Sequence, residues 1–319
     1  MPEVPVVLQS VTVTVPGTTA NLGPGFDCLG AALTLYNRFH FTALDQPPGT
    51  YSIEVRGLEA ERVSRDSSNL VYRAFAHFYQ QQQQPVPAIA LTIDLEVPLA
   101  RGLGSSSTAI VGGILGANAL WAQPLDQSSL ITMAVALEGH PDNVVPALVG
   151  GCQLSVVDDQ GQVTVCPVSW HPSLAPIVAI PGFELSTTTA RQVLPTHYSR
   201  ADAIFNTAHL GLLLRGLETG HGDWLRIALA DRLHQPYRQT LIPGYGAVAE
   251  AAIGAGAYGL VISGAGPTLL ALAPVTIAPQ VCDTLRLIWQ QQGQTVRTAV
   301  LQLQTQGAWV EPNPARGPE

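Results

Sequence analysis

The chain has 319 residues, of which 46% are hydrophobic and only 12% are charged, and its formal net charge is -8 at pH 7. This length predicts two fused lobes, and the hydrophobic fraction is sufficient for a substantial core. The composition lacks the positive surface that a nucleic acid requires, so a small-molecule partner is expected.

All 15 basic residues are arginine, because the sequence contains no lysine. A P-loop nucleotide triphosphatase needs the lysine of its phosphate loop, a protein kinase needs a strand lysine, and a Schiff-base enzyme needs a lysine amine. The composition therefore excludes these three classes of enzyme.

The cysteines and the N-terminal segment bear on the cellular location. The four cysteines are widely spaced, without a CxxC pair: Cys28, Cys152, Cys166 and Cys282. This spacing argues against a zinc site and against a compact disulfide framework. The N-terminal segment has no basic region followed by a long apolar stretch, and no segment has the uninterrupted apolar length of a membrane span. We expect a cytoplasmic protein with no membrane partner.

The first half of the chain predicts strands and one helix before the first chemical motif. Val11, Val13 and Val15 alternate with threonines, which is the period-two pattern of a half-buried strand. A Gly/Pro-rich loop is expected from Pro16 to Gly25. Further elements are expected in this order: strands at 39–41 and 51–55, a helix at 69–80, a glutamine-rich surface connection at 80–84 and a strand at 89–97.

A glycine- and serine-rich segment follows that strand and leads into an apolar helix that ends near Trp121. It reads Gly102-Leu-Gly-Ser-Ser-Ser-Thr108. Glycines allow close backbone approach, and serines can cap the helix and direct hydroxyls into the same space. A helix N-terminus binds anions through its free N–H groups and needs no lysine. The segment predicts a phosphate-binding loop, although an ordinary capped loop would have a similar sequence.

The second half of the chain predicts another lobe of alternating strands and helices. The polar, proline-containing stretch Trp170–Pro176 is the expected boundary. The N-terminal lobe is therefore expected over residues 1–170 and the C-terminal lobe over 171–305. Residues 306–319 are expected to be a frayed tail, since the segment from Glu311 onward contains three prolines and no apolar anchor.

Three glycine-rich segments in this order resemble the motifs of the GHMP kinases. They are Pro16–Asp27, Arg101–Thr108 and Gly259–Thr268. Within that superfamily, residues 138–143, 187–195 and 230–245 resemble segments of the homoserine kinases. The resemblance implies a two-lobe α+β fold, with an N-terminal lobe of mixed sheet and helices and a ferredoxin-like C-terminal lobe. It also implies ATP-dependent phosphorylation of the L-homoserine hydroxyl to O-phospho-L-homoserine, a step of threonine biosynthesis.

The substrate that the resemblance implies carries two charged groups, a carboxylate and an ammonium, which the site must bind. Arg191 and Arg238 are expected to hold the carboxylate, because a planar guanidinium suits bidentate contacts with it. Asn21 and Asp27 have the polarity required by the ammonium and the hydroxyl. Two residues complete the expected substrate-binding set: Thr187 and Gly264.

Three residues of one segment are expected to be catalytic: Asp142, His140 and Asn143. Asp142 is the candidate general base. However, homoserine kinases are thought to manage without a dedicated base, and phosphoryl transfer depends mainly on positioning and charge neutralisation. We therefore expect Asp142 chiefly to orient the substrate.

ATP and Mg²⁺ are the expected cofactors, with Ser106 and Glu138 as metal ligands, because this hard cation prefers oxygen. Small alanines are more common in the family after Ser106, so which loop hydroxyl binds the metal remains open. The adenine contacts are expected from Asn69 and Leu70, which a helix cap and a core leucine explain nearly as well. The phosphate segment is expected to comprise Pro98, Leu99, Ala100, Arg101, Gly102, Leu103, Gly104, Ser105, Ser106 and Ser107.

Two other interpretations remain open. One is another GHMP kinase, acting on mevalonate, its phosphorylated derivative or a sugar alcohol. A neutral polyol has no carboxylate for the paired arginines, and mevalonate has no ammonium for Asp27. The other is a catalytically silent family member that senses a ligand, against which the presence of both Glu138 and Ser106 argues. A homodimer is expected by analogy with the family.

Overall fold

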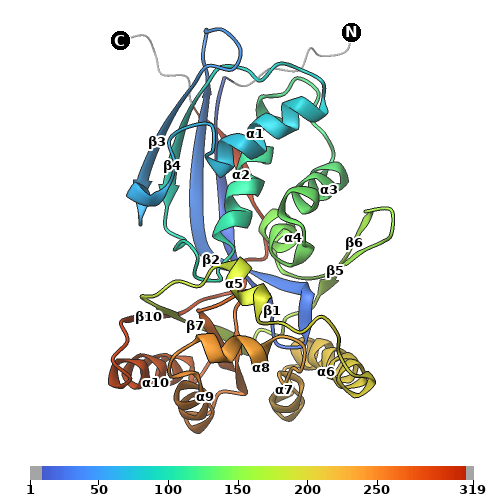
Figure 1. The fold of residues 1–319 in the computed structure, drawn as a ribbon, viewed down its shortest axis with the longest axis vertical. Coiled ribbons are helices and arrows are strands. Elements are labelled where there is room, and N and C mark those ends of the chain that lie inside the picture. Colours follow the sequence, from blue (N-terminus) through green and yellow to red (C-terminus); the bar gives the residue numbers. More distant parts are fainter. Residues whose placement is uncertain (1–8, 314–319) are drawn as a thin grey trace.

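The computed structural model describes residues 9–313, which form two lobes stacked along the long axis of the molecule (Figure 1). The strands of the upper lobe are β1 (Ser10–Asn21), β2 (Gly25–Ala43), β3 (Tyr51–Gly57), β4 (Ile89–Leu95), β5 (Cys152–Val157), β6 (Val163–Val168) and β11 (Trp309–Pro312). Its helices are α1 (Leu70–Gln81), α2 (Ser105–Leu120), α3 (Gln127–Glu138) and α4 (Pro141–Val149), with a 3₁₀ turn at Ala60–Arg62.

The upper sheet has the order β11-β1-β2-β4-β3, and β5 extends it by pairing with β2 and with β6. All pairs are antiparallel except β3 with β4. Helices α1 to α4 cover one face of the sheet (Figure 1). The predicted valine alternation is confirmed as part of β1, with Val11, Val13 and Val15 completely buried against these helices.

Helix α2 is buried between the sheet and α1, which explains its unusual glycine content. A Cβ atom on Gly112 would collide with the ring of Phe39, and one on Gly116 would collide with the ring of Phe41. Close approach of the helix to the sheet therefore requires glycine at these positions. This contact sets the distance of α2 from the sheet, and therefore also the position of the glycine-rich loop that precedes the helix.

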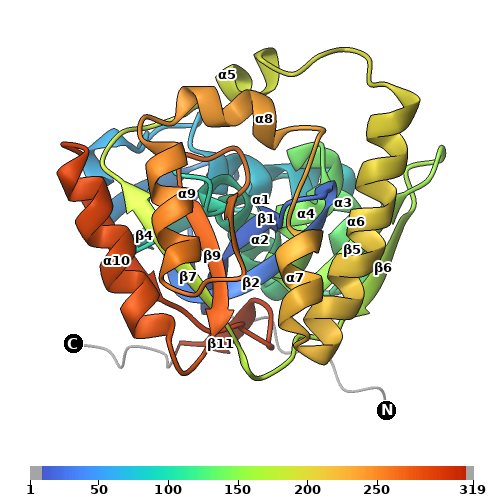
Figure 2. The same cartoon turned by 90° about the horizontal axis from the view of Figure 1, so that it is seen from below.

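The lower lobe contains a second sheet built from β7 (Leu174–Pro181), β8 (Gly259–Ile262), β9 (Leu269–Pro274) and β10 (Val296–Val300). Its helices are α5 (Thr187–Gln192), α6 (Arg200–Thr219), α7 (Gly222–Ala228), α8 (Gln235–Arg238), α9 (Tyr245–Gly254) and α10 (Ala278–Gln291), with a 3₁₀ turn at Gln239–Leu241. The strand order β10-β7-β9-β8 with antiparallel pairing confirms the ferredoxin-like character of this lobe. Figure 2 shows α9 and α10 against this sheet.

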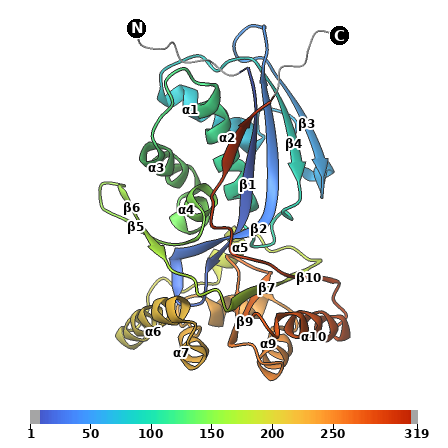
Figure 3. The ribbon, with the colours of Figure 1, turned by 180° about the vertical axis from the view of Figure 1, so that it is seen from behind.

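The two lobes share a hydrophobic cluster, so buried contacts as well as the connecting chain join them. The inner ends of β1 and β2 cross from the upper lobe into the lower one (Figure 3). There Leu22 and Leu29 join a buried cluster with Leu174, Val178 and Leu270. Elements of both lobes therefore contribute to one buried cluster.

Two expectations for local structure were wrong. Most of the segment expected to be a loop from Pro16 to Gly25 belongs to β1, which pairs with β2 as far as Asn21 and bulges near Thr18. The expected tail contains β11, which pairs with β1 so that Val310 lies opposite Val13. Residues 314–319 of that tail lie outside the described residues. The lobe limits at 1–170 and 171–305 stay a prediction, and the second sheet begins at Leu174.

Candidate active site

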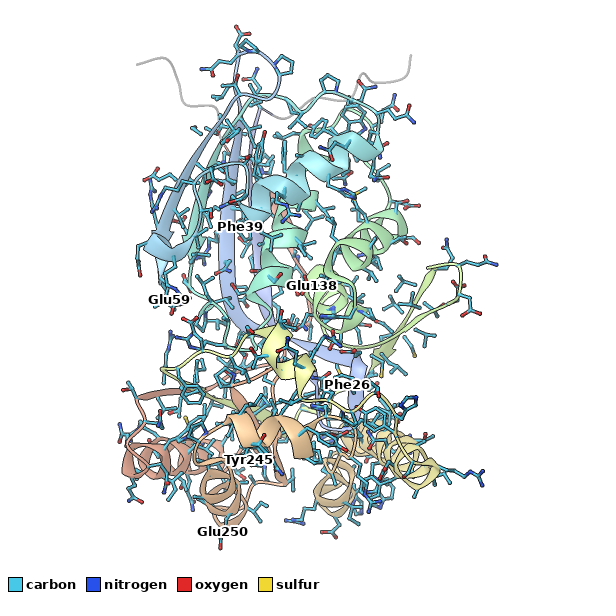
Figure 4. The ribbon with its side chains drawn as sticks, in the orientation of Figure 1. Phe26, Phe39, Glu59, Glu138, Tyr245 and Glu250 are labelled. Atoms are coloured by element: carbon cyan, nitrogen blue, oxygen red, sulfur yellow. The ribbon has the colours of Figure 1, made fainter. Side chains whose placement is uncertain are left out.

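A cavity of about 920 Å³ opens between the lobes and collects nearly all of the residues expected from the sequence. It is lined by the β1–β2 turn, α1, the phosphate loop, the ends of α3 and α4, α5, α8 and the glycine loop before β9. The expected residues that do not line it are Asn69, Pro98, Leu99 and Leu103. Figure 4 shows Glu138 on the upper lobe and Phe26 below it, near the level where the lobes meet.

The phosphate loop presents the N-terminus of α2 to this cavity. Gly104 precedes the helix with φ +68°, and no side chain caps the first turn. Gly102 has φ +74°, and a Cβ atom there would collide with the carbonyl oxygen of Ser263 on the other lobe. Because the first N–H groups of a helix lack intrahelical partners and carry the positive end of its dipole, this geometry suits a phosphate.

Two serines of the loop hold the carboxylate of Glu138 at the edge of the cavity. Ser106 donates from Oγ to Oε2 at 3.1 Å, and Ser107 donates to Oε1 at 2.9 Å. Ser106 is exposed to the cavity, whereas Ser107 is completely buried. The arrangement places a carboxylate and an accessible hydroxyl side by side next to the phosphate loop.

The side chains of several residues expected to contact the nucleotide make contacts within the protein. Asn69 caps α1, because its Oδ1 accepts from the backbone N–H groups of Val71 and Tyr72 at 3.0 and 3.3 Å. Leu103 is buried in the core between the lobes. The guanidinium of Arg101 bonds to protein carbonyls and carboxylates rather than facing a phosphate. A sequence motif gives the order of these residues but not the direction of each side chain.

An ion pair lies at the side of the cavity formed by α5 and the β1–β2 turn. Arg191 of α5 donates to both carboxylate oxygens of Asp27, at 2.9 and 2.8 Å. This hydrogen-bonded pair raises the pKa of Arg191 despite the opposing effect of burial. Asp27 has φ +57°, and its backbone N–H donates to Oδ1 of Asn21 at 3.1 Å, so the turn that carries the carboxylate is fixed.

Arg238 lies behind this pair and is only 2% exposed. Its Nε donates to the carbonyl oxygen of Ala190 at 3.1 Å, and Nη1 donates to that of Gly264 at 2.9 Å. Burial, and then the charge of Arg191, lower the pKa of Arg238. Phe26 lies beside both arginines, with its ring centre 5.1 Å from the guanidinium carbon of Arg238 and 5.7 Å from that of Arg191.

His140, Asp142 and Asn143 meet at the start of α4, beside the phosphate loop. Nδ1 of His140 lies 2.7 Å from Oδ1 of Asp142, and Thr18 donates to Oδ1 of Asn143 at 2.7 Å. Burial opposes the charged form of His140, but the hydrogen bond and charge of Asp142 outweigh it, so the pKa of His140 is raised. A Cβ atom on Gly30 would collide with the carbonyl oxygen of Asp142, so a glycine in β2 allows this close approach.

Sequence reasoning missed some residues of the site. Phe26 belongs to the first motif, yet only the structure shows that its ring contacts both arginines. Arg73, His77 and Gln80 line the far end of the cavity together with Leu70. They recur at helical spacing on one face of α1, which is a periodic polar signal that could have indicated a wall of the site.

Comparison with known proteins agrees with this architecture. The model of the GHMP kinases N terminal domain matches residues 69–151, and that of the GHMP kinases C terminal domain matches residues 213–286. A homoserine kinase of Trichormus variabilis is 61% identical over 302 residues, which is 95% of this chain and 99% of that protein. The chain belongs to the homoserine kinase family of the GHMP kinases. A homoserine kinase of Synechococcus sp. is 59% identical over 94% of this chain and 98% of its own length.

Solved structures extend the comparison beyond close relatives. The crystal structure of homoserine kinase from Cytophaga hutchinsonii has a TM-score of 0.86 at 27% identity, covering 95% of this chain and 98% of that one. An L. major mevalonate kinase in complex with R-mevalonate has a TM-score of 0.71 at 14% identity, covering 94% and 98%. The homoserine kinase family thus shares its fold with kinases of other acceptors, so the acceptor has to be argued from the site.

Proposed function

We propose that the chain transfers the γ-phosphoryl group of ATP to the side-chain hydroxyl of L-homoserine, giving O-phospho-L-homoserine. The observation that carries the proposal is the buried cation Arg238 beside the ion pair of Asp27 and Arg191. Within residues 9–313, no carboxylate lies within 4.0 Å of the Arg238 guanidinium, whose protein partners are two carbonyl oxygens and, at 3.4 Å, Nδ1 of His234.

A zwitterionic amino acid fits this set of charges. Its ammonium can take the place of Arg191 on Asp27, while its carboxylate lies between Arg191 and Arg238. An acid without an ammonium would compete with Asp27 for Arg191 and leave a half-buried carboxylate unpaired, which is costly. This argument favours an amino acid over mevalonate, and the requirement for an anion disfavours a neutral sugar.

The nucleotide would lie with its phosphates on the N-terminus of α2. Mg²⁺ usually takes one or two carboxylates together with phosphate oxygens and waters. Glu138 and the Ser106 hydroxyl offer such oxygen donors beside the phosphate loop, and within the described residues no three His, Cys, Asp or Glu side chains converge on a metal site. The donors fit the ion, which would neutralise phosphate charge when bound.

The remaining polar residues would position the acceptor. Phosphoryl transfer depends mainly on alignment of the hydroxyl with the terminal phosphate and on charge neutralisation. His140, Asp142 and Asn143 line the cavity between the phosphate loop and the arginines, where that hydroxyl must lie. The expected setting is the cytoplasm and the biosynthesis of threonine, and a homodimer stays a prediction. No helix in residues 9–313 is long and apolar enough to cross a membrane.

A coupled ADP-release assay with Mg-ATP tests the proposal. The acceptors are L-homoserine, 4-hydroxybutyrate, mevalonate and galactose, and 4-hydroxybutyrate is the matched probe because it lacks only the ammonium. We expect turnover with L-homoserine, and a rise in its KM of about 10- to 100-fold in Arg191→Leu, since a charged hydrogen bond contributes about 1.5–3 kcal/mol. Arg226→Leu is the control, because Arg226 is exposed, contacts Asp223 and the ring of Tyr258, and is not among the residues that line the cavity.

Other outcomes would reassign the protein. Preferred turnover of mevalonate or galactose would replace homoserine as the acceptor. A protein that binds ATP but turns over none of the four would have to be treated as a silent member of the family.

A further inference from the structure

Arg101, the residue before the phosphate loop, is buried to 7% exposure and bonds to both lobes. Nε donates to the carbonyl oxygen of Pro181 at 3.1 Å, and Nη2 donates to that of Gly182 at 3.0 Å. Nη1 donates to the carbonyl oxygen of Leu99 at 2.8 Å. These contacts join the entry of the phosphate loop to the end of β7.

Two carboxylates complete the surroundings of this guanidinium. Nη2 lies 3.3 Å from Oε1 of Glu59, and Nη1 lies 3.1 Å from Oε1 of Glu184. A guanidinium has five N–H donors in a rigid plane, and here each has an acceptor. Glu59 also accepts from the backbone N–H of Leu99 at 2.9 Å. The side chain is therefore held in one orientation, with no donor left for a phosphate.

The segment that Arg101 holds leads directly to the acceptor end of the cavity. From Gly182 the chain continues through Glu184 to α5, which carries Arg191. The phosphate loop follows Arg101 in the other direction, and its backbone meets the lower lobe again where Ser263 donates to the carbonyl oxygen of Gly102 at 2.6 Å. The Arg101 side chain thus links the segment that begins the phosphate loop to the segment that leads to α5, where the backbone N–H of Leu185 also donates to the carbonyl oxygen of Ala100.

Arg62 provides an internal comparison, because it contacts the same two carboxylates but not the backbone carbonyl oxygens that Arg101 holds. It donates to Glu184 at 2.7 Å and to Glu59 at 3.2 Å. Its side chain is 38% exposed, and it makes none of the bonds to Pro181, Gly182 or Leu99. A purely electrostatic role of this cluster of Glu59, Arg62, Arg101 and Glu184 would involve both arginines. A positioning role would depend on Arg101.

We propose that Arg101 is a positioning residue that couples the phosphate loop to α5, so that an acceptor held by Arg191 lies in line with the terminal phosphate of the nucleotide. The identity of the acceptor rests on the function proposed above, whereas the coupling between the phosphate loop and α5 is independent of that identity. Because a misplacement of about 1 Å at a reacting centre can reduce the rate on the order of 100-fold, a contact that fixes this spacing acts on turnover rather than on binding.

The first test measures the coupling without any acceptor. Hydrogen exchange of the α5 amides, residues 187–192, is followed with and without the ATP analogue AMPPNP and Mg²⁺ in the wild-type protein, Arg101→Met and Arg62→Met. We expect the analogue to slow exchange in the wild type and in Arg62→Met by about fivefold or more, the lower end of typical coupling between sites. In Arg101→Met this effect should be lost, although the analogue still binds. Slowing in Arg101→Met equal to that in the wild type, or none in the wild type, would overturn the proposal.

The second test measures turnover with L-homoserine at a temperature well below the Tm of each variant. Arg101→Met should lower kcat about 10- to 100-fold, with both KM values changed less than about threefold and a larger share of ATP hydrolysed without phosphorylated product. Glu184→Gln, which keeps an acceptor, should show a smaller effect. An unchanged kcat in a folded Arg101→Met protein with a lower Tm would show a structural role only. Lack of turnover in the wild type would instead count against the acceptor, while the exchange data would still decide the coupling.

Discussion

Arg238 and Gly264 are joined by a hydrogen bond of 2.9 Å from Nη1 to the carbonyl oxygen, and the side-chain amide of Asn21 donates to the same oxygen at 2.9 Å. One backbone oxygen therefore connects α8, the C-terminal glycine loop and the end of β1. The carbonyl oxygens fix the direction of the Arg238 side chain but do not neutralise its charge. A buried cation in this situation gains most from an anion that arrives with the substrate.

Replacing Arg238 by lysine should weaken binding of the acceptor selectively. Lysine keeps a charge but loses the planar fork that can bond a carboxylate and two carbonyl oxygens together. We expect the KM for L-homoserine to rise about 10- to 100-fold, with a much smaller change in the KM for ATP. Steady-state kinetics measure both, and Arg226→Lys on the surface is the control. Equal increases in the two KM values would contradict a role specific to the acceptor.

Ser106 and Ser107 should differ in their effects on the metal requirement. Both donate to Glu138, but Ser106 is open to the cavity and Ser107 is buried. We expect Ser106→Ala to raise the Mg²⁺ concentration needed for half-maximal activity about 10-fold or more, because it removes a candidate ligand. Ser107→Ala should have a smaller effect, since outer contacts orient a ligand without replacing it. Binding of Mn²⁺ to the complex with AMPPNP, followed by electron paramagnetic resonance, checks the order independently of turnover. A larger effect of Ser107→Ala than of Ser106→Ala would identify Ser107 as the metal ligand.

The sequence could predict the site where backbone chemistry is restrictive. Gly102 and Gly104 adopt positive φ and leave no room for a Cβ atom, so their spacing before an apolar helix indicates a close-approach loop. The alternation of Val11, Val13 and Val15 likewise predicts a strand, because a side-chain period of two needs a face to bury. Such patterns depend on neighbouring residues in the sequence, so they can be interpreted without knowing which distant segment packs against them.

Features that depend on distant partners could not be predicted in the same way. Strand β11 pairs with β1, so that Glu311 lies opposite Thr12, and its four residues have no strand pattern of their own. The direction of the Arg101 side chain is decided by Glu59 and by the end of β7, which are remote in sequence. Motif spacing identified Arg101 as part of the phosphate segment, but the contacts show that its guanidinium joins two lobes.

The stability contributed by His140 should depend on pH in a defined direction. Its pKa is raised above the ordinary value of 6.5, since Asp142 outweighs the effect of burial. A group with a raised folded pKa stabilises the protein fully below its unfolded pKa, and this contribution is lost as pH rises through the folded pKa. The Tm of the wild type minus that of His140→Asn should therefore be largest near pH 5.5 and shrink above about pH 6.5.

Thermal unfolding of both proteins between about pH 5.5 and pH 8.5 measures this difference. The buried His234, whose pKa is lowered mainly by desolvation, acts with the opposite sign but is present in both proteins and cancels. A difference that grows with increasing pH would mean that His140 is stabilised in its neutral form. In that case its hydrogen bond to Asp142 would be made by a neutral imidazole.

A variant of Asp142 tests whether the enzyme uses a general base. Its Oδ1 lies 2.7 Å from Nδ1 of His140 and accepts a longer bond of 3.4 Å from Asn143, so the carboxylate is already held within the protein. Asp142→Asn keeps the size of the side chain and removes its charge and its proton affinity. If the carboxylate chiefly orients the acceptor, kcat should fall about 10- to 100-fold, because alignment is impaired but the acceptor hydroxyl can still lose its proton as it is phosphorylated.

The matched variant is Asn143→Ala, which removes a neighbouring positioning group and leaves the carboxylate, and kcat is measured for both variants. Two positioning residues should give losses of similar size, with a similar dependence of kcat on pH in both variants. A fall of about 10 000-fold or more in Asp142→Asn alone, with an intact fold and unchanged KM values, would identify Asp142 as the general base.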